Sequence, residues 1–112
     1  MQFQILNNGK PLTMGELDKS AADFWGVEID PKEYVAPKGF IWPMTWFNFI
    51  GESIAMMPKG THDWSDVIGY LCRVAASGDT SFTEFQHSVE AYKPFIELCF
   101  YWKSLGYVPV TL

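Results

Sequence analysis

The spacing of apolar and polar residues changes along the chain, and each change of period predicts a new strand or helix. Residues 2–6 alternate with a period of two, which is typical of a short strand. The dipeptide Asn8-Gly9 follows and favours the positive φ angles of a tight hairpin turn. A return strand is therefore expected over residues 10–12. The chain begins with a small β-hairpin.

Helical spacing then predicts two helices in the first half of the chain. The first opens at a capping box, Thr13 to Glu16, in which each side chain can satisfy an amide of the other residue, and it ends at Gly26. The second covers residues 45–57 and is apolar around nearly its whole circumference. A helix of that kind belongs at the centre of a bundle or against a partner.

Two more helices are expected in the second half. The third keeps the three-four spacing of one apolar face over residues 64–75 and stops at Gly78. The fourth spans residues 81–106, again from a capping box to a glycine. Because Pro94 deprives one carbonyl of its donor, we expect this helix to kink or break near Lys93.

The end of the chain completes the expected fold. Residues 107–112 are β-branched and aromatic enough for a last strand, which Pro109 would confine to an edge of the sheet. The sequence therefore predicts one globular domain over residues 1–112. Its fold class is α+β and helix-dominant, with about four helices packed with a small N-terminal β-hairpin and a C-terminal edge strand.

The distribution of charged residues argues against two classes of partner, nucleic acids and membranes. Thirteen acidic residues against eight basic ones leave a net charge of −5, and the seven lysines and Arg73 are scattered. Nucleic-acid binding is disfavoured, because it depends on clustered basic side chains. The longest charge-free run, residues 39–51, is too short to span a membrane. The N-terminus has no signal-peptide pattern, so we expect a cytoplasmic location.

No group of residues predicts a catalytic site, a metal or another cofactor. Ser53 lies in a loose nucleophile-elbow pattern but has no strand before it. Glu84 and His87 share a helix face, as in di-iron bundles, but those proteins use two such motifs. Cys72 and Cys99 both fall within apolar helical patterns and are expected to be buried, reduced thiols.

The aromatic run of residues 40–49 carries the leading hypothesis for function. Aromatic side chains are enriched at interface hot spots, although they also form cores. We interpret the chain as a non-enzymatic interaction or accessory protein, of a bacterium or phage by analogy of composition, that binds another protein or itself. The residues expected to bind the partner are Phe40, Trp42, Trp46 and Phe47.

Two other interpretations stay open. The first is a small-molecule-binding domain, or a small hydrolase, with a pocket between the helices. Its expected ligand-binding residues are Tyr70, Glu84, His87, Tyr92 and Tyr101. The second is an acidic mimic of nucleic acid, which would need carboxylates clustered on one face. Here the carboxylates are spread over every segment.

Overall fold

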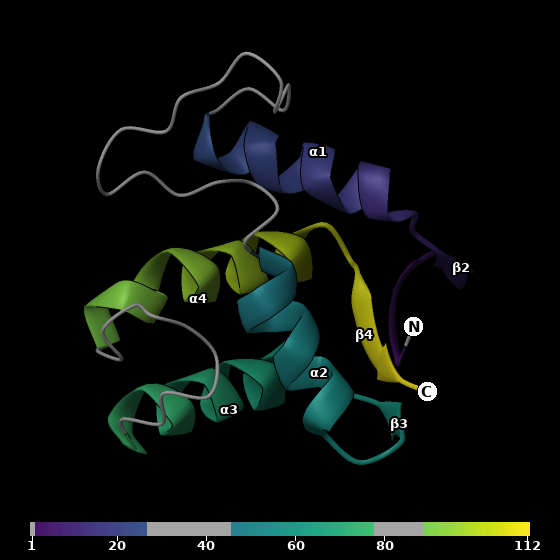
Figure 1. Cartoon of the computed structure of the whole chain (residues 1–112). Coiled ribbons are helices and arrows are strands. Elements are labelled where there is room, and N and C mark those ends of the chain that lie inside the picture. Colours follow the sequence, from purple (N-terminus) through teal and green to yellow (C-terminus); the bar gives the residue numbers. More distant parts are fainter. Residues whose placement is uncertain (1, 27–45, 78–88) are drawn as a thin grey trace.

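A small sheet lies at one side of the molecule and the helices lie against it (Figure 1). The computed structural model describes residues 2–26, 46–77 and 89–112. The strands are β1 (Phe3–Asn7), β2 (Lys10–Pro11), β3 (Gly60–Thr61) and β4 (Val108–Thr111). The helices are α1 (Met14–Trp25), the π-helical turn η2 (Phe47–Gly51), α2 (Glu52–Met56), α3 (Trp64–Ser77) and α4 (Val89–Ser104). The predicted α+β, helix-dominant fold is confirmed.

The four strands form one antiparallel sheet in the order β2-β1-β4-β3. The turn between β1 and β2 has positive φ at both central residues, 53° at Asn8 and 78° at Gly9. This is the hairpin turn that the sequence predicts, because Asn and Gly tolerate that backbone conformation. Strand β3 contains only two residues and was not predicted.

The last strand forms as predicted, but it lies inside the sheet, between β1 and β3, rather than at an edge. The carbonyl of Pro109 accepts a hydrogen bond from the backbone amide of His62 at 2.9 Å. Because the N–H and C=O of one strand residue point the same way, the amide proton that proline lacks would have pointed toward β3. The proline therefore removes no hydrogen bond between β4 and its longer neighbour β1.

Helix α1 begins and ends where its capping residues predict. The side chain of Thr13 accepts from the amide of Glu16, and the Glu16 carboxylate accepts from the amide of Thr13, each at 3.1 Å. Gly26 closes the helix in the left-handed conformation. Both ends thus satisfy backbone groups that would otherwise have no intrahelical partner.

The second predicted helix contains a feature that the pattern did not reveal. Its described part starts as the π-helical turn η2 and continues as α2 to Met56, before Pro58. Gly51 ends the π-helical turn against the ring of Phe3. A Cβ atom at this glycine would lie 2.8 Å from Cζ of Phe3. The absent side chain lets this helical segment approach β1 closely.

A kink or a break was expected near Lys93, and the break is absent, because helix α4 continues through Pro94. Tyr92 and Phe95 lie on either side of the proline and are both buried. Their packing offsets the hydrogen bond that proline removes. The expected stop of α3 at Gly78 and the start of the fourth helix at Ser81 lie outside the described residues.

The C-terminal end of α4 matches the predicted stop at Gly106, whose φ is 81°. Its amide donates to the carbonyl of Lys103 at 3.0 Å, and the amide of Tyr107 donates to the carbonyl of Trp102 at 3.1 Å. These two bonds make a Schellman motif, which requires the left-handed conformation that glycine adopts most readily. The chain then turns directly into β4.

Three tryptophans tie the core together. Trp46 and Trp102 pack edge to face with ring centroids 5.3 Å apart, and both are fully buried. The indole of Trp102 donates to the hydroxyl of Ser20 at 2.9 Å, and that of Trp64 donates to the carbonyl of Tyr107 at 2.7 Å. The rings of Trp102 and Trp64 therefore each have a partner for their one polar atom, as buried tryptophans usually do.

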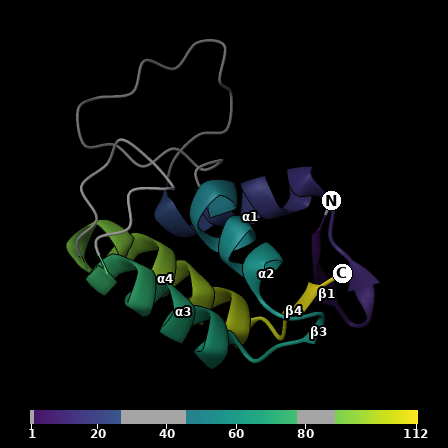
Figure 2. The same ribbon diagram turned by 60° about the horizontal axis from the view of Figure 1, so that its bottom comes forward.

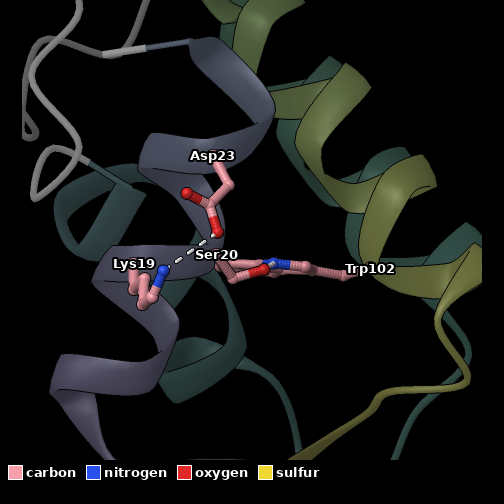
Figure 3. Close-up of polar contacts among 4 residues, drawn as sticks. All are labelled: Lys19, Ser20, Asp23 and Trp102. Carbon is pink, nitrogen blue, oxygen red and sulfur yellow. Dashed lines mark hydrogen bonds and ion pairs between the residues drawn. The ribbon is translucent and has the colours of Figure 1, made fainter. Parts of the chain in front are cut away.

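Helix α1 presents one side to this core and the other to solvent (Figure 3). Ser20 points toward Trp102 of α4, whereas Lys19 and Asp23 form an ion pair of 3.6 Å on the solvent side. The side chains of that pair are 70% and 63% exposed. An exposed i,i+4 pair contributes little to stability, so the core side of α1, where Ser20 contacts Trp102, contributes more to holding the helix in place.

Candidate interaction surface

The four residues expected to bind a partner do not form one surface among the described residues. Trp46 is fully buried, so the structure assigns it to the core. Phe47 is half-buried and lines a groove of about 270 Å³ together with Phe3. Phe40 and Trp42 lie outside the described residues. Of the predicted set, only Phe47 reaches the described surface.

The residues expected to bind a small molecule lie in separate places. Tyr92 is buried and packs edge to face on Phe49, with centroids 5.2 Å apart. Tyr101 stacks on Phe24 at 4.8 Å. Tyr70 lies on α3, and its hydroxyl is 3.7 Å from the sulfur of Met56 on α2. Glu84 and His87 lie outside the described residues. None of these three tyrosines lines the groove at Phe47.

The two cysteines differ in their surroundings. Cys99 is buried as predicted, and burial raises the pKa of its thiol far above the ordinary value. Cys72 is exposed, so the prediction that it is buried is wrong. It directly follows buried Leu71 on α3, and one residue along a helix is a turn of about 100°. The step carries Cys72 out of the core-facing stripe.

Other candidates for chemistry also have structural roles in the part of the chain that is described. The hydroxyl of Ser53 is buried and donates to the carbonyl of Phe49, one turn earlier. A hydroxyl held in this way does not form a nucleophile elbow. Within residues 2–26, 46–77 and 89–112, no three His, Cys, Asp or Glu side chains gather where they could hold a metal ion.

The sheet carries a surface that the sequence analysis missed. Cross-strand pairing places Gln4 opposite Val110 and Leu6 opposite Val108. Paired residues share one side of a sheet. We call this side the outer face and define it by six residues: Gln4, Leu6, Pro11, Thr61, Val108 and Val110. None of the six carries a charge, and none is fully buried.

The opposite side of the same strands faces the core. Phe3, Ile5, Pro109 and Thr111 alternate with the outer-face residues, and all four are buried. Figures 1 and 2 show from two directions that the described helices lie to one side of the strands. A sheet with one solvated face usually places polar residues on it. Here the middle of the outer face is apolar.

Thr111 holds the sheet to the helices from the inner side. Its buried hydroxyl donates to the carbonyl of Ile54 at the end of α2. The same hydroxyl oxygen lies 2.8 Å from Nε2 of His62. Since the only hydroxyl proton is used toward Ile54, His62 is the donor in the second bond. These contacts fix β4 and, with it, the orientation of the outer face.

A groove of about 340 Å³ opens beside the outer face, between β1 and the start of α1. Gln4 and Pro11 belong both to the outer face and to the lining of this groove. The other lining residues are apolar, with Leu12 and Met14 half-buried at its wall. The groove thus extends the uncharged surface from the sheet toward α1.

A signal for this surface was present in the sequence. The segment from Tyr107 to Leu112 has apolar residues at both alternating sets of positions, whereas a strand with one solvated face alternates apolar and polar. That absence of alternation indicates a strand with apolar residues on both faces.

Comparisons with known proteins find no match to this chain among family models, curated proteins or solved structures. Within the described residues, no helix combines the length and the hydrophobicity needed to cross a bilayer.

Proposed function

We propose that this chain is a non-enzymatic protein that binds a protein partner through the outer face of its sheet. The observation that carries the proposal is the composition of that face. Leu6, Val108 and Val110 lie at its middle, and none of its six residues is charged in a chain with a net charge of −5. An apolar sheet face is stabilised when another element covers it.

The chemistry of the described residues supports an interaction protein over an enzyme. Ser53 and Cys99 are buried, and Ser53 is held by a backbone carbonyl. Cys72 is exposed on α3. An accessory role and a cytoplasmic location belong to the same proposal. They rest on the acidic composition and on the two cysteines, neither of which forms a disulfide.

Affinity purification from the protein's own cells tests the proposal. The baits are the wild type, the variant Val110→Lys on the outer face, and the matched control Ser65→Lys on the exposed side of α3. Both variants add one positive charge, so only its position differs. We expect one protein to be recovered at constant stoichiometry with the wild type and with Ser65→Lys, and to be lost with Val110→Lys.

Folding has to be established alongside the capture experiment. Far-UV circular dichroism of both variants should match the wild type, because Val110 is half-buried and faces away from the core. If a folded Val110→Lys variant recovers the same partner at the same stoichiometry, the outer face is not the binding surface. The proposed function would then be wrong in its essential part.

The groove beside the outer face supports a second candidate, a small-molecule-binding domain. Its volume of about 340 Å³ and its apolar lining are in the range of ligand pockets. Native mass spectrometry of protein purified from its own cells would then reveal a small added mass. Met14→Trp, which fills the groove, should remove that mass, whereas Ser65→Lys should keep it. Bare protein at 12.8 kDa in all three samples would contradict this candidate.

A further inference from the structure

We propose that the groove at Phe47 binds an organic ammonium cation. This groove has a volume of about 270 Å³ and is lined by Gln2, Phe3, Phe47, Gly51, Glu52 and Ala55. We call it the Phe47 groove. It shares no residue with the outer face, so the inference goes beyond the proposed function and does not depend on it.

The π-helical turn η2 brings an aromatic ring and a carboxylate to the same groove. The amide of Glu52 donates to the carbonyl of Phe47, five residues earlier, which is the bond that defines a π-helical turn. In an α-helix each residue turns by about 100°, so residues five apart would point about 140° away from each other. Around the wider π-helical turn, Phe47 and Glu52 both line the groove. Such turns are rare and occur frequently at functional sites.

A second aromatic ring lies next to the first. Phe3 on β1 also lines the groove, and its ring centroid is 5.6 Å from that of Phe47, with the two planes tilted by 53°. Gly51 allows this arrangement, because a Cβ atom there would lie 2.8 Å from Cζ of Phe3. Aromatic rings attract a cation that lies within about 6 Å of the ring centroid. With centroids this close, one bound cation can meet that distance to both rings.

Charge decides the class of ligand. Glu52 is the one charged residue among the six, and it is exposed. Within residues 2–26, 46–77 and 89–112, its carboxylate has no hydrogen bond or ion pair. This carboxylate and the net charge of −5 repel an anion and attract a cation. A metal ion would need several oxygen ligands, whereas an organic ammonium group needs one carboxylate and the rings.

The dimensions of the groove set the size of the ligand and the strength of binding. Ligand pockets begin at about 300 Å³, so the Phe47 groove fits an ammonium group with its nearest carbon atoms and not a large molecule. Because water screens the exposed carboxylate, we expect a Kd on the order of 1–10 mM. An ammonium group can belong to a free amine or to a lysine side chain, and the experiment includes both sources.

A titration followed in ¹H–¹⁵N spectra, at an ionic strength held constant with sodium chloride, tests the inference. The two cationic probes are choline and lysine blocked at both backbone ends. Their neutral controls are the alcohol in which carbon replaces the nitrogen of choline, and blocked norleucine. We expect a cationic probe to shift the amides of Phe47, Gly51 and Glu52, but not those of Ser65 and Gly69 on α3. Its neutral control should bind at least about fivefold more weakly, and the cation that binds more tightly identifies the source.

Matched variants locate the site. Glu52→Gln removes the carboxylate but keeps the size of the side chain, and Glu97→Gln removes the same charge from the exposed side of α4. Glu52→Gln should raise the Kd by about twofold to fivefold, whereas Glu97→Gln should leave it unchanged. Phe47→Leu keeps an apolar side chain without the ring and should also raise the Kd by about twofold to fivefold. Circular dichroism checks the fold of each variant, and Glu52→Gln decides alone if Phe47→Leu does not fold.

Three results would overturn the inference. The first is the absence of amide shifts with either cation up to about 50 mM. The second is equal binding of a cation and its neutral control, and the third is a Kd that Glu52→Gln leaves unchanged. None of these results bears on the proposed function, which is tested separately by Val110→Lys on the outer face.

Discussion

The indole of Trp46 donates its Nε1 proton to Oδ1 of Asp18 across 2.7 Å. The two residues are 28 positions apart, and their contact joins α1 to the residue that precedes η2. Trp46 is fully buried, whereas Asp18 is half-buried and keeps contact with water. The carboxylate therefore satisfies the one polar atom of a core side chain without itself being removed from solvent.

Removing this acceptor should destabilise the fold. Asp18→Ala leaves a buried indole N–H without a partner, and we expect it to lower the free energy of unfolding by about 1–3 kcal/mol. Asp18→Asn retains a carbonyl acceptor and should lose less. Urea denaturation followed by circular dichroism measures both. Asp23→Ala, on the solvent side of the same helix, is the control and should cost no more than about 0.5 kcal/mol. Equal losses for Asp18→Ala and Asp23→Ala would contradict the structural role of the contact.

Elements that depend on neighbouring residues could be predicted from the sequence. The capping box at Thr13, the turn at Asn8 and Gly9, and the stop at Gly106 involve contacts within about five positions. The inner position of β4 could not, because it depends on the pairing of Pro109 with His62, far away in sequence. No local pattern states which strand will lie beside a proline.

The candidate site was harder to predict for a related reason. An aromatic run shows that large side chains are available, but not which of them the fold buries. Trp46 lies in the core because it packs on Trp102 and donates to Asp18. Both partners come from elements outside the run. The outer face was overlooked because Leu6 and Val108 become neighbours only when the two ends of the chain pair. A surface formed by strands that are distant in the sequence can be predicted only when the pairing of those strands is known.

Gly51 offers a test of close packing between the η2 turn and the sheet. The Cβ atom of an alanine there would lie 2.8 and 2.9 Å from two atoms of the Phe3 ring, which is itself buried. Overpacking of a core costs about 1–3 kcal/mol, and the higher helix propensity of alanine offsets part of that cost. We expect Gly51→Ala to lower the free energy of unfolding by about 1 kcal/mol. An unchanged or higher value in urea denaturation would show that Phe3 moves aside freely.

Gly69 is the control position, and alanine there should change the free energy of unfolding in the opposite direction. It lies in the interior of α3, is exposed, and has no atom within 4 Å of the place where a Cβ would be. Alanine at an exposed helix interior is more stable than glycine by about 0.5–1 kcal/mol. Gly69→Ala should therefore raise the midpoint of urea denaturation while Gly51→Ala lowers it. A loss of stability in both variants would mean that α3 does not tolerate the added methyl group.

The two cysteines should differ in reactivity. Cys72 is exposed and Cys99 is buried, so an aromatic disulfide reagent should modify one thiol per native chain and both thiols in denaturant. In the native Cys72→Ser variant, the fast reaction with the reagent should be absent. Cys99 should then react slowly, at a rate that reports opening of the core. Two fast-reacting thiols in the native protein would contradict the burial of Cys99.

Cys99 should also make the stability fall at alkaline pH. Burial raises the pKa of its thiol in the folded chain well above the ordinary value of 9.0, so the folded state holds this proton after the unfolded state has lost it. Stability rises with pH only where the unfolded state binds more protons, and here it binds fewer. The contribution is therefore complete below about pH 9 and declines above it by up to about 1.4 kcal/mol per pH unit. Urea denaturation in buffers from about pH 7 to about pH 10.5 measures the decline. Other groups also titrate there, so the comparison is with Cys99→Val, which should show a shallower decline, and with Cys72→Ser, which should follow the wild type. Parallel curves for the wild type and Cys99→Val would mean that the thiol ionises as easily in the folded chain as in the unfolded one.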